Sequence, residues 1–392
     1  MSFLRCILLS AIISLLSQTI FAAELKLDPS LAIKQEYNDN IYLDAASRSH
    51  DFITTFSPGI TLETKTESAG VNINARVDQR YYADLKDLNA LDQFYKGSFY
   101  YLVHPRLNIS AKANYSIDSS PDRDILTTGL LLNAVTRERQ SYSFSGEHRI
   151  SEGTLAILSY EYGRDDYYSE KHNDMESQNV NLGVIHDLSY FTLLTKGRTN
   201  FGYSRYIYSG AEIDNYTGTV GLSRDLNEIW SLLLDAGARY TTSKFSGSLA
   251  NANTEQTSQG SGWVGQATLS YKGLLTNGNL TFSQDVMPAY GQIGTTERTS
   301  LNFSINRKFT YELSGGLSAR YFLNKSSQEQ YALQKIDSQT TNVTPSIRYE
   351  FTKNTSIEAS YNYVFYKDSV ANTDADRNLF MVRLYIQHPL FD

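Results

Sequence analysis

The charged side chains that could carry chemistry in this chain recur at the polar positions of alternating segments. In such a segment every second residue is apolar, so the charged residue between two apolar ones projects from the opposite face. We predict that the following residues line one polar wall: Arg76, Lys112, Asp235, Arg239, Arg320, Arg348, Glu358 and Arg383. With their Ser, Thr, Asn and Gln neighbours they indicate either a hydrated wall suited to an uncharged or weakly charged solute, or charges that pair only for stability.

Other residue types predict neither catalysis nor a cofactor. The six histidines lie far apart in the sequence, without the spacing of metal ligands. No nucleophile elbow, phosphate-binding loop or dinucleotide fingerprint occurs, so we expect no enzyme and no cofactor. Acidic runs at 118–124, 164–166 and 374–377 could bind divalent cations or bridge lipopolysaccharide phosphates, although a solvated loop is the simpler interpretation.

The elements that position these residues follow a period of two. Apolar residues alternate with polar ones in 107–115, 313–321 and 357–365, and the same rhythm recurs from Leu25 to Phe391. Such alternation is typical of strands with one apolar and one polar face. No later segment has the length and apolar character of a transmembrane helix.

The links between these segments alternate in length. Short links fall at 67–70, 104–106, 151–153, 225–228, 273–278, 308–311 and 352–354, and longer ones at 38–50, 84–91, 119–137, 169–174, 209–213, 243–260, 324–337 and 367–376. Short periplasmic turns opposite longer extracellular loops are typical of an all-β, antiparallel, up-and-down transmembrane β-barrel. We expect about eighteen strands. Sixteen stays open because Pro29 interrupts the first strand, Leu25–Tyr37, and 187–199 could be turn or strand.

Composition and the N-terminus agree with this fold. The chain has 29 Tyr and 18 Phe but 7 Pro, and a formal net charge of −7 without a basic patch, so no nucleic-acid partner is expected. Arg5, the apolar stretch 6–20 and Phe21-Ala22-Ala23 predict a signal peptide over 1–23 and a barrel over 24–392. Cys6, the one cysteine, lies in the segment expected to be removed.

Aromatic residues cluster where alternate strands end, which predicts an interfacial girdle. The cluster comprises Tyr81, Tyr82, Tyr162, Tyr167, Tyr168, Tyr206, Tyr208, Tyr240, Tyr290, Tyr321, Phe322, Phe365 and Tyr366. A soluble sandwich with core tyrosines is the alternative, but it does not account for the unequal links. The last segment, Leu379–Phe391, partly resembles the C-terminal signal of barrels, which implies the barrel assembly machinery as a partner.

The start of the predicted barrel resembles a known family. Glu36-Tyr37, Asn38-Asp39-Asn40, Asp51-Phe52-Ile53, Pro58-Gly59 and the Tyr81-Tyr82 pair are similar to the opening of the beta-barrel porin type 2 family, outer-membrane proteins of exopolysaccharide gene clusters. The match covers about sixty residues. It implies a pore for polysaccharide export and identifies no catalytic residue. Asn38-Asp39-Asn40 predicts a turn, with a calcium site as the alternative.

Together these patterns predict a channel in the outer membrane of a Gram-negative cell. A barrel of this size should keep an aqueous lumen, narrowed by the links 119–137 and 243–260. We expect exopolysaccharide export, with a general or sugar-uptake porin, or a non-conducting structural or adhesive barrel, as alternatives. Expected partners are outer-membrane lipid and lipopolysaccharide, the transported polysaccharide and a periplasmic export protein.

Overall fold

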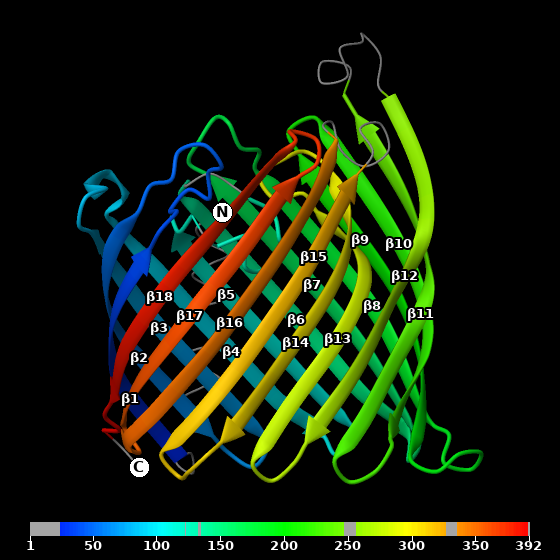
Figure 1. Cartoon of the computed structure of the whole chain (residues 1–392). Helices are drawn as coiled ribbons and strands as arrows, with labels where there is room; N and C mark the ends of the chain where they lie inside the picture. The colour runs from blue at the N-terminus through cyan, green and yellow to red at the C-terminus, as the bar shows by residue number, and fades with distance from the viewer. Residues whose placement is uncertain (1–23, 122, 132–134, 247–255, 327–334, 391–392) are drawn as a thin grey trace, which may run out of the picture.

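The chain forms one antiparallel sheet of eighteen strands that closes on itself, as the computed structural model shows (Figure 1). The structure describes residues 24–121, 123–131, 135–246, 256–326 and 335–390, so the predicted signal peptide and Phe391 lie outside the described residues. The strands and one short 3-10 helix are β1 (Glu24–Asn38), β2 (Asp51–Lys65), β3 (Ala69–Tyr82), η2 (Lys86–Leu88), β4 (Ala90–His104), β5 (Leu107–Asp118), β6 (Arg137–Ser151), β7 (Thr154–Tyr167), β8 (Met175–Asp187), β9 (Thr195–Tyr208), β10 (Ala211–Asp225), β11 (Trp230–Phe245), β12 (Gln256–Lys272), β13 (Thr276–Pro288), β14 (Thr295–Lys308), β15 (Leu313–Ser326), β16 (Ile336–Thr352), β17 (Thr355–Asp368) and β18 (Thr373–Gln387).

Closure leaves the sheet without an unpaired edge. Each strand pairs with its neighbours in sequence, and β1 also pairs with β18, from Ser30 opposite Gln387 to Asn38 opposite Leu379. All backbone groups along the wall can therefore bond to a neighbouring strand, which a bilayer requires. The predicted fold class and the count of eighteen strands are confirmed. No helix among the described residues is long and apolar enough to cross a membrane.

Two uncertain junctions of the sequence are settled. The expectation that Pro29 interrupts the first strand is wrong, because β1 runs through it: Pro29 pairs with Ile60 of β2, and its carbonyl accepts a hydrogen bond from the His388 amide at 3.0 Å. The stretch 187–199 contains both alternatives, since β8 ends at Asp187, a turn spans 188–194, and β9 begins at Thr195.

The connections differ between the two rims (Figure 1). One rim carries the start of β1, the end of β18 and mostly tight turns, such as 105–106 and 152–153. The opposite rim carries 39–50, 119–136 and the other long connections. This second rim also carries 289–294, between β13 and β14, a connection absent from the predicted links although Pro288, Gly291 and Gly294 are turn formers.

The outer surface of the barrel is apolar. Phe201, Val220 and Trp263 lie in the middle of their strands, yet 60%, 65% and 56% of these side chains is exposed. Their neighbours in sequence, such as Asn200 and Thr219, line a cavity inside the barrel. Apolar exposure on this scale is unfavourable in water and expected where the wall faces lipid. The chain is therefore an outer-membrane β-barrel.

The predicted aromatic girdle is only half correct. Tyr81, Tyr240 and Tyr321 are exposed on the outer wall, as expected. Adjacent strand residues point to opposite faces, however, so their partners turn inward. These inward aromatics are 4–7% exposed and pack beneath the long connections: Tyr82, Tyr167, Tyr206, Tyr208 and Phe322. Tyr290, which is 8% exposed, lies in the β13–β14 connection itself.

The Asn38-Asp39-Asn40 segment forms a turn that fastens the seam between β1 and β18. The Asn38 side chain accepts a hydrogen bond from the Asn40 amide at 2.9 Å. The Asp39 carboxylate accepts two bonds from Asn378 of β18, each at 2.7 Å. These side-chain oxygens already accept hydrogen bonds from the protein, as the turn interpretation of the motif predicts.

Candidate functional site

The connection between β5 and β6 crosses the lumen of the barrel. We call its described residues, 119–121, 123–131 and 135–136, the bridge. The bridge reaches the opposite wall, where Thr340 donates a hydrogen bond to the Gly129 carbonyl at 2.7 Å and Asn324 donates to the Thr128 carbonyl at 3.0 Å. Arg320 donates to the Leu126 carbonyl at 2.9 Å. The predicted narrowing of the lumen by 119–137 is thus present in the fold.

Glycine is needed at the tip of the bridge. Gly129 has a φ of 74°, a conformation that side chains with a Cβ rarely adopt. A Cβ placed there would also lie 2.5 Å from the Cβ of Phe322. Backbone can therefore approach the wall closely enough for the Thr340 bond only because residue 129 has no side chain.

A buried ion network gives the bridge its shape. The Asp124 carboxylate lies 3.0 Å from Arg137 Nη1 and 3.0 Å from Arg123 Nε. The Asp124 carbonyl accepts a hydrogen bond from the Thr128 hydroxyl at 2.7 Å. Asp124 is 3% exposed, so the ion pairs are shielded from water and removal of one partner would leave an uncompensated buried charge.

Three further connections fold inward over the lumen. From the β13–β14 connection, Tyr290 and Ile293 join a buried cluster with Val135 of the bridge, and the Gly294 carbonyl accepts a bond from the Tyr208 hydroxyl at 2.7 Å. The β7–β8 connection joins them through an isolated pairing of Asn173 with Gly291. From the β1–β2 connection, Leu43 packs with Ile125 of the bridge.

The β7–β8 connection also carries a shifted histidine outside the membrane-spanning strands. Burial lowers the pKa of His172, whose ring stacks on Tyr167 with ring centroids 5.5 Å apart. At neutral pH the ring is therefore uncharged, and it packs as part of this inward-folded cover.

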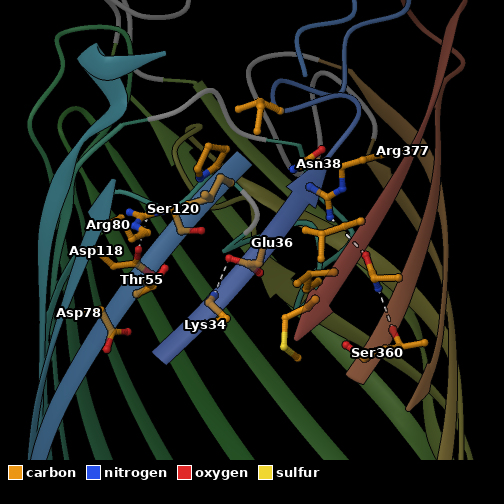
Figure 2. A pocket seen from close by; sticks show the side chains of 18 of the residues that line it. Lys34, Glu36, Asn38, Thr55, Asp78, Arg80, Asp118, Ser120, Ser360 and Arg377 are labelled. Atoms are coloured by element: carbon orange, nitrogen blue, oxygen red, sulfur yellow. Dashed lines mark hydrogen bonds and ion pairs between the residues drawn. The ribbon is translucent and has the colours of Figure 1, made fainter. Parts of the chain in front are cut away.

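Two cavities lie on opposite sides of the lumen and share no lining residue. The first compartment has a volume of about 460 Å³ and is lined by β1–β5, the bridge and β15–β18 (Figure 2). The second compartment has a volume of about 810 Å³ and is lined by strands from β5 to β13, with Tyr290 of the inward-folded β13–β14 connection. The first compartment lies against the bridge, through Ser120, Pro121 and Leu126, and the second lies along the wall from β5 to β13.

The first compartment is rich in charge, and most of its acids are neutralised by a neighbour on their own strand or the next. Lys34 lies 2.7 Å from Glu36. Arg76 lies 3.0 Å from Asp78, and Arg80 lies 2.6 Å from Asp92.

The wall formed by β15–β18 carries cations instead. Arg320 and Arg377 line the first compartment from this side. Figure 2 shows Arg377 across the cavity from Thr55 and Asp118.

Many small uncharged polar groups line the second compartment. Its charged pair Arg198 and Asp235 is closed at 3.1 Å, and Arg298 lies 3.4 Å from Asp285. Lys112, Arg139 and Glu161 also line this cavity. Between the charged residues lie many hydroxyl and amide groups from β5–β10: Ser110, Ser143, Ser145, Ser159, Ser177, Asn179, Asn181, Asn200, Ser204, Asn215, Thr217 and Thr219. Such groups exchange hydrogen bonds with a hydroxylated solute at little cost.

The charged residues predicted to line a polar wall are all in strands, but they do not form one site. Arg320 lies in the first compartment, and Lys112 and Asp235 lie in the second. Arg239 is 3% exposed and forms an ion pair with Glu297 of β14, so it ties the wall together. Nearer the rim that carries the tight turns, Arg383 pairs with Glu358 at 2.8 Å and Arg348 pairs with Glu350 at 3.3 Å. The Arg76 guanidinium lies 4.6 Å from the centre of the Phe94 ring.

The residues that shape the lumen most carry little signal in the sequence. Asp124 was noted only as part of the acidic run 118–124, Gly129 and Arg137 only as part of a long link, and Tyr290 was assigned to the girdle. Of the second predicted constriction, 243–260, residues 247–255 lie outside the described residues, and the described parts belong almost entirely to β11 and β12. Within the described ranges, no group of three or more His, Cys, Asp or Glu side chains could hold a metal ion.

Comparisons with known proteins give only distant likenesses to solved structures. No protein-family model and no curated protein sequence matches the chain. Among solved structures, Acinetobacter baumannii OccAB1 is 12% identical with a TM-score of 0.48, over 94% of this chain and 97% of that one. OccAB4 of the same organism is 10% identical with a TM-score of 0.49, over 94% and 98%.

The outer-membrane protein OpdK of Pseudomonas aeruginosa is 10% identical with a TM-score of 0.45, over 92% of this chain and 99% of that one. At these identities and scores the likenesses carry no inference about what passes through this barrel. Its own closed sheet, apolar exterior and bridged lumen make it an outer-membrane β-barrel.

Proposed function

We propose that this barrel is a passive diffusion channel for small polar solutes, with sugars as the main class, across the outer membrane. The observation that carries the proposal is the bridge, which is fastened to the opposite wall by Thr340, Asn324 and Arg320. A solute has to pass beside it through a compartment of limited size.

The volumes of the two compartments suit small molecules. Cavities that hold small ligands commonly measure about 300–1,000 Å³. The compartments of about 460 and 810 Å³ fall in that range. A monosaccharide or disaccharide fits such a space, whereas a long polymer would have to thread between the bridge and the wall.

The lining supports a neutral, hydroxylated solute. Ser143 of β6, Asn179 of β8 and Ser204 of β9 face the second compartment in one row, with Glu161 of β7 between the first two. Water and a sugar hydroxyl make equivalent hydrogen bonds to such groups, so entry and exit both stay easy. A channel needs this balance, because tight binding would stop flux.

The alternative function is exopolysaccharide export, which the resemblance to the beta-barrel porin type 2 family implies. Continuous passage of a polymer would require the bridge to leave the lumen. That movement would break its bonds to Thr340 and Asn324 and uncover the buried Asp124. We therefore place the uptake alternative first.

Liposome swelling separates these functions. We expect vesicles containing the purified barrel to swell in isosmotic glucose and sucrose, and not in a maltodextrin of ten or more units. A deletion strain should keep its surface polymer and lose uptake of the small sugars. Unaltered uptake together with loss of surface polymer would show that export is the function instead.

A further inference from the structure

Four turns on the rim of tight turns expose large apolar side chains. They connect β8 to β9, β10 to β11, β12 to β13 and β14 to β15, and they follow one another along the lower rim in Figure 1, because these strands are consecutive in the sheet. Two of the side chains, Tyr190 and Tyr311, are 94% and 98% exposed. We call the whole set the apolar crescent: Tyr190, Phe191, Leu193, Leu194, Leu226, Ile229, Leu274, Leu275, Phe309 and Tyr311.

The other tight turns of the same rim are polar. The turns 66–68, 105–106, 152–153 and 353–354 contain no large apolar side chain, and each contains one charged residue: Glu67, Arg106, Glu152 and Lys353. An environment that surrounds the whole barrel, such as lipid, would favour one composition along the whole rim. The contrast indicates that one part of the rim has a neighbour that the other part lacks.

The apolar crescent is larger than the apolar patches that soluble surfaces usually leave uncovered. With about 200 Å² for a large side chain, its members together expose on the order of 1,000 Å². The largest apolar patch on a monomer commonly measures about 300–600 Å². A stable protein–protein interface buries about 800 Å² on each partner, so the crescent is large enough to form one.

The outer wall marks where the membrane ends on this side of the barrel. Trp230 and Tyr271 face outward at the rim ends of β11 and β12, where they pair in register with ring centroids 4.9 Å apart. Such rings settle at the level of the lipid headgroups. By strand alternation Arg224 and Arg307 also face outward, at the level where guanidinium groups can meet lipid phosphates. The turns beyond these residues therefore extend past the headgroups, into the periplasm.

One member of the crescent has a strained backbone. Leu194 has a φ of 55°, a conformation that residues with a Cβ rarely adopt. Glycine or asparagine would relieve this strain, yet the chain has a leucine here and its side chain is 61% exposed. Strain that keeps an apolar side chain at the surface is expected where that side chain makes a contact.

We propose that the apolar crescent docks a folded periplasmic protein that has an apolar face with a basic margin. The apolar face covers the crescent, and the basic margin meets Glu228 and Glu312, two exposed acids in the same turns. A second copy of this chain in the same membrane would meet the barrel through its outer wall instead of through turns that project from the membrane. The proposal goes beyond the channel function, because passive diffusion requires no docked protein.

Cysteine labelling of the full barrel in cells of its native species and in phospholipid nanodiscs tests the proposal. Leu274→Cys and Tyr311→Cys, each in a Cys6→Ser background, place one thiol on the crescent. The reagent is a small charged maleimide that enters the periplasm. We expect it to label both thiols about tenfold more slowly in cells than in nanodiscs, because a partner present at about ten times its Kd protects its site to that extent.

Glu152→Cys is the matched control, because it places a thiol on a polar turn of the same rim. It should be labelled at the same rate in cells and in nanodiscs. Tyr190→Asp, added to the Leu274→Cys chain, introduces a charge elsewhere on the crescent and should return labelling in cells to the rate in nanodiscs.

Three results would overturn the proposal. Fast labelling of the crescent thiols in cells would show that no protein covers them. Slow labelling in nanodiscs as well would assign the cover to lipid or to a second copy of the chain. Protection in cells that is unchanged by Tyr190→Asp, or that extends to Glu152→Cys, would show that the crescent is not the docking surface. None of these results bears on solute flux, so the channel function stands or fails separately.

Discussion

Replacement of residues 123–131 by a short glycine–serine linker should raise the single-channel conductance of the barrel several-fold. This segment contains the Gly129 tip and the Asp124 network, and it occupies the middle of the lumen. Without it the two compartments merge into one aqueous pore, whose width is set by the eighteen strands alone. Planar-bilayer recordings of the purified protein in potassium chloride measure the effect.

A control for this variant should alter a connection that stays outside the lumen. The β17–β18 turn is suitable, because 369–372 is exposed and Val370 is 50% exposed. Glycine–serine replacement of 369–371 should leave conductance at the wild-type level. Equal conductance in all three proteins would show that the bridge does not limit the pore.

Substitution of Phe201 by arginine should cost the folded barrel about 2–4 kcal/mol, because a cation near the bilayer midplane loses its hydration. Phe201 lies at the centre of β9 and is 60% exposed on the outer wall. Asn200→Arg places the same charge one residue away, in the second compartment, and should cost far less. Urea unfolding in lipid vesicles measures both free energies.

This pair of variants tests the assignment of the two faces. A free energy of unfolding lowered equally by both substitutions would mean that the outer wall of β9 is not in contact with lipid. The comparison needs no knowledge of the solute, because the two positions differ only in the direction of the side chain.

Much of the barrel could be predicted because a strand wall obeys a local rule. Alternation places Arg320 and Asn200 inside and Phe201 outside without any knowledge of the rest of the fold. The same rule, applied more strictly, would have corrected the girdle: Tyr81 and Tyr82 are adjacent, so only one of them can face lipid. Pro29 does not end its strand, because proline lacks only the backbone N–H donor and its carbonyl still accepts a hydrogen bond.

The site could not be predicted to the same extent, because it depends on contacts between distant residues. Gly129 meets Phe322 and Thr340 across the lumen, and nothing near residue 129 in the sequence encodes that meeting. The β13–β14 connection does carry a local signal in the sequence, its two glycines. Gly291 and Gly294 have positive φ values of 75° and 134°, which glycine adopts readily. Its inward fold over the lumen depends on Tyr208 and Asn173, which lie far away in the sequence.

Cysteine accessibility tests most directly whether solutes travel through the lumen beside the bridge. Cys6 is the one natural cysteine, so a single cysteine can be placed in the barrel of a Cys6→Ser background. Thr219 of β10 lines the second compartment, and its neighbour Val220 is 65% exposed on the outer wall. A bulky, water-soluble, thiol-reactive reagent should reduce the current of Thr219→Cys and leave that of Val220→Cys unchanged. Equal block of both variants, or no block of Thr219→Cys despite complete labelling, would contradict passage through the lumen.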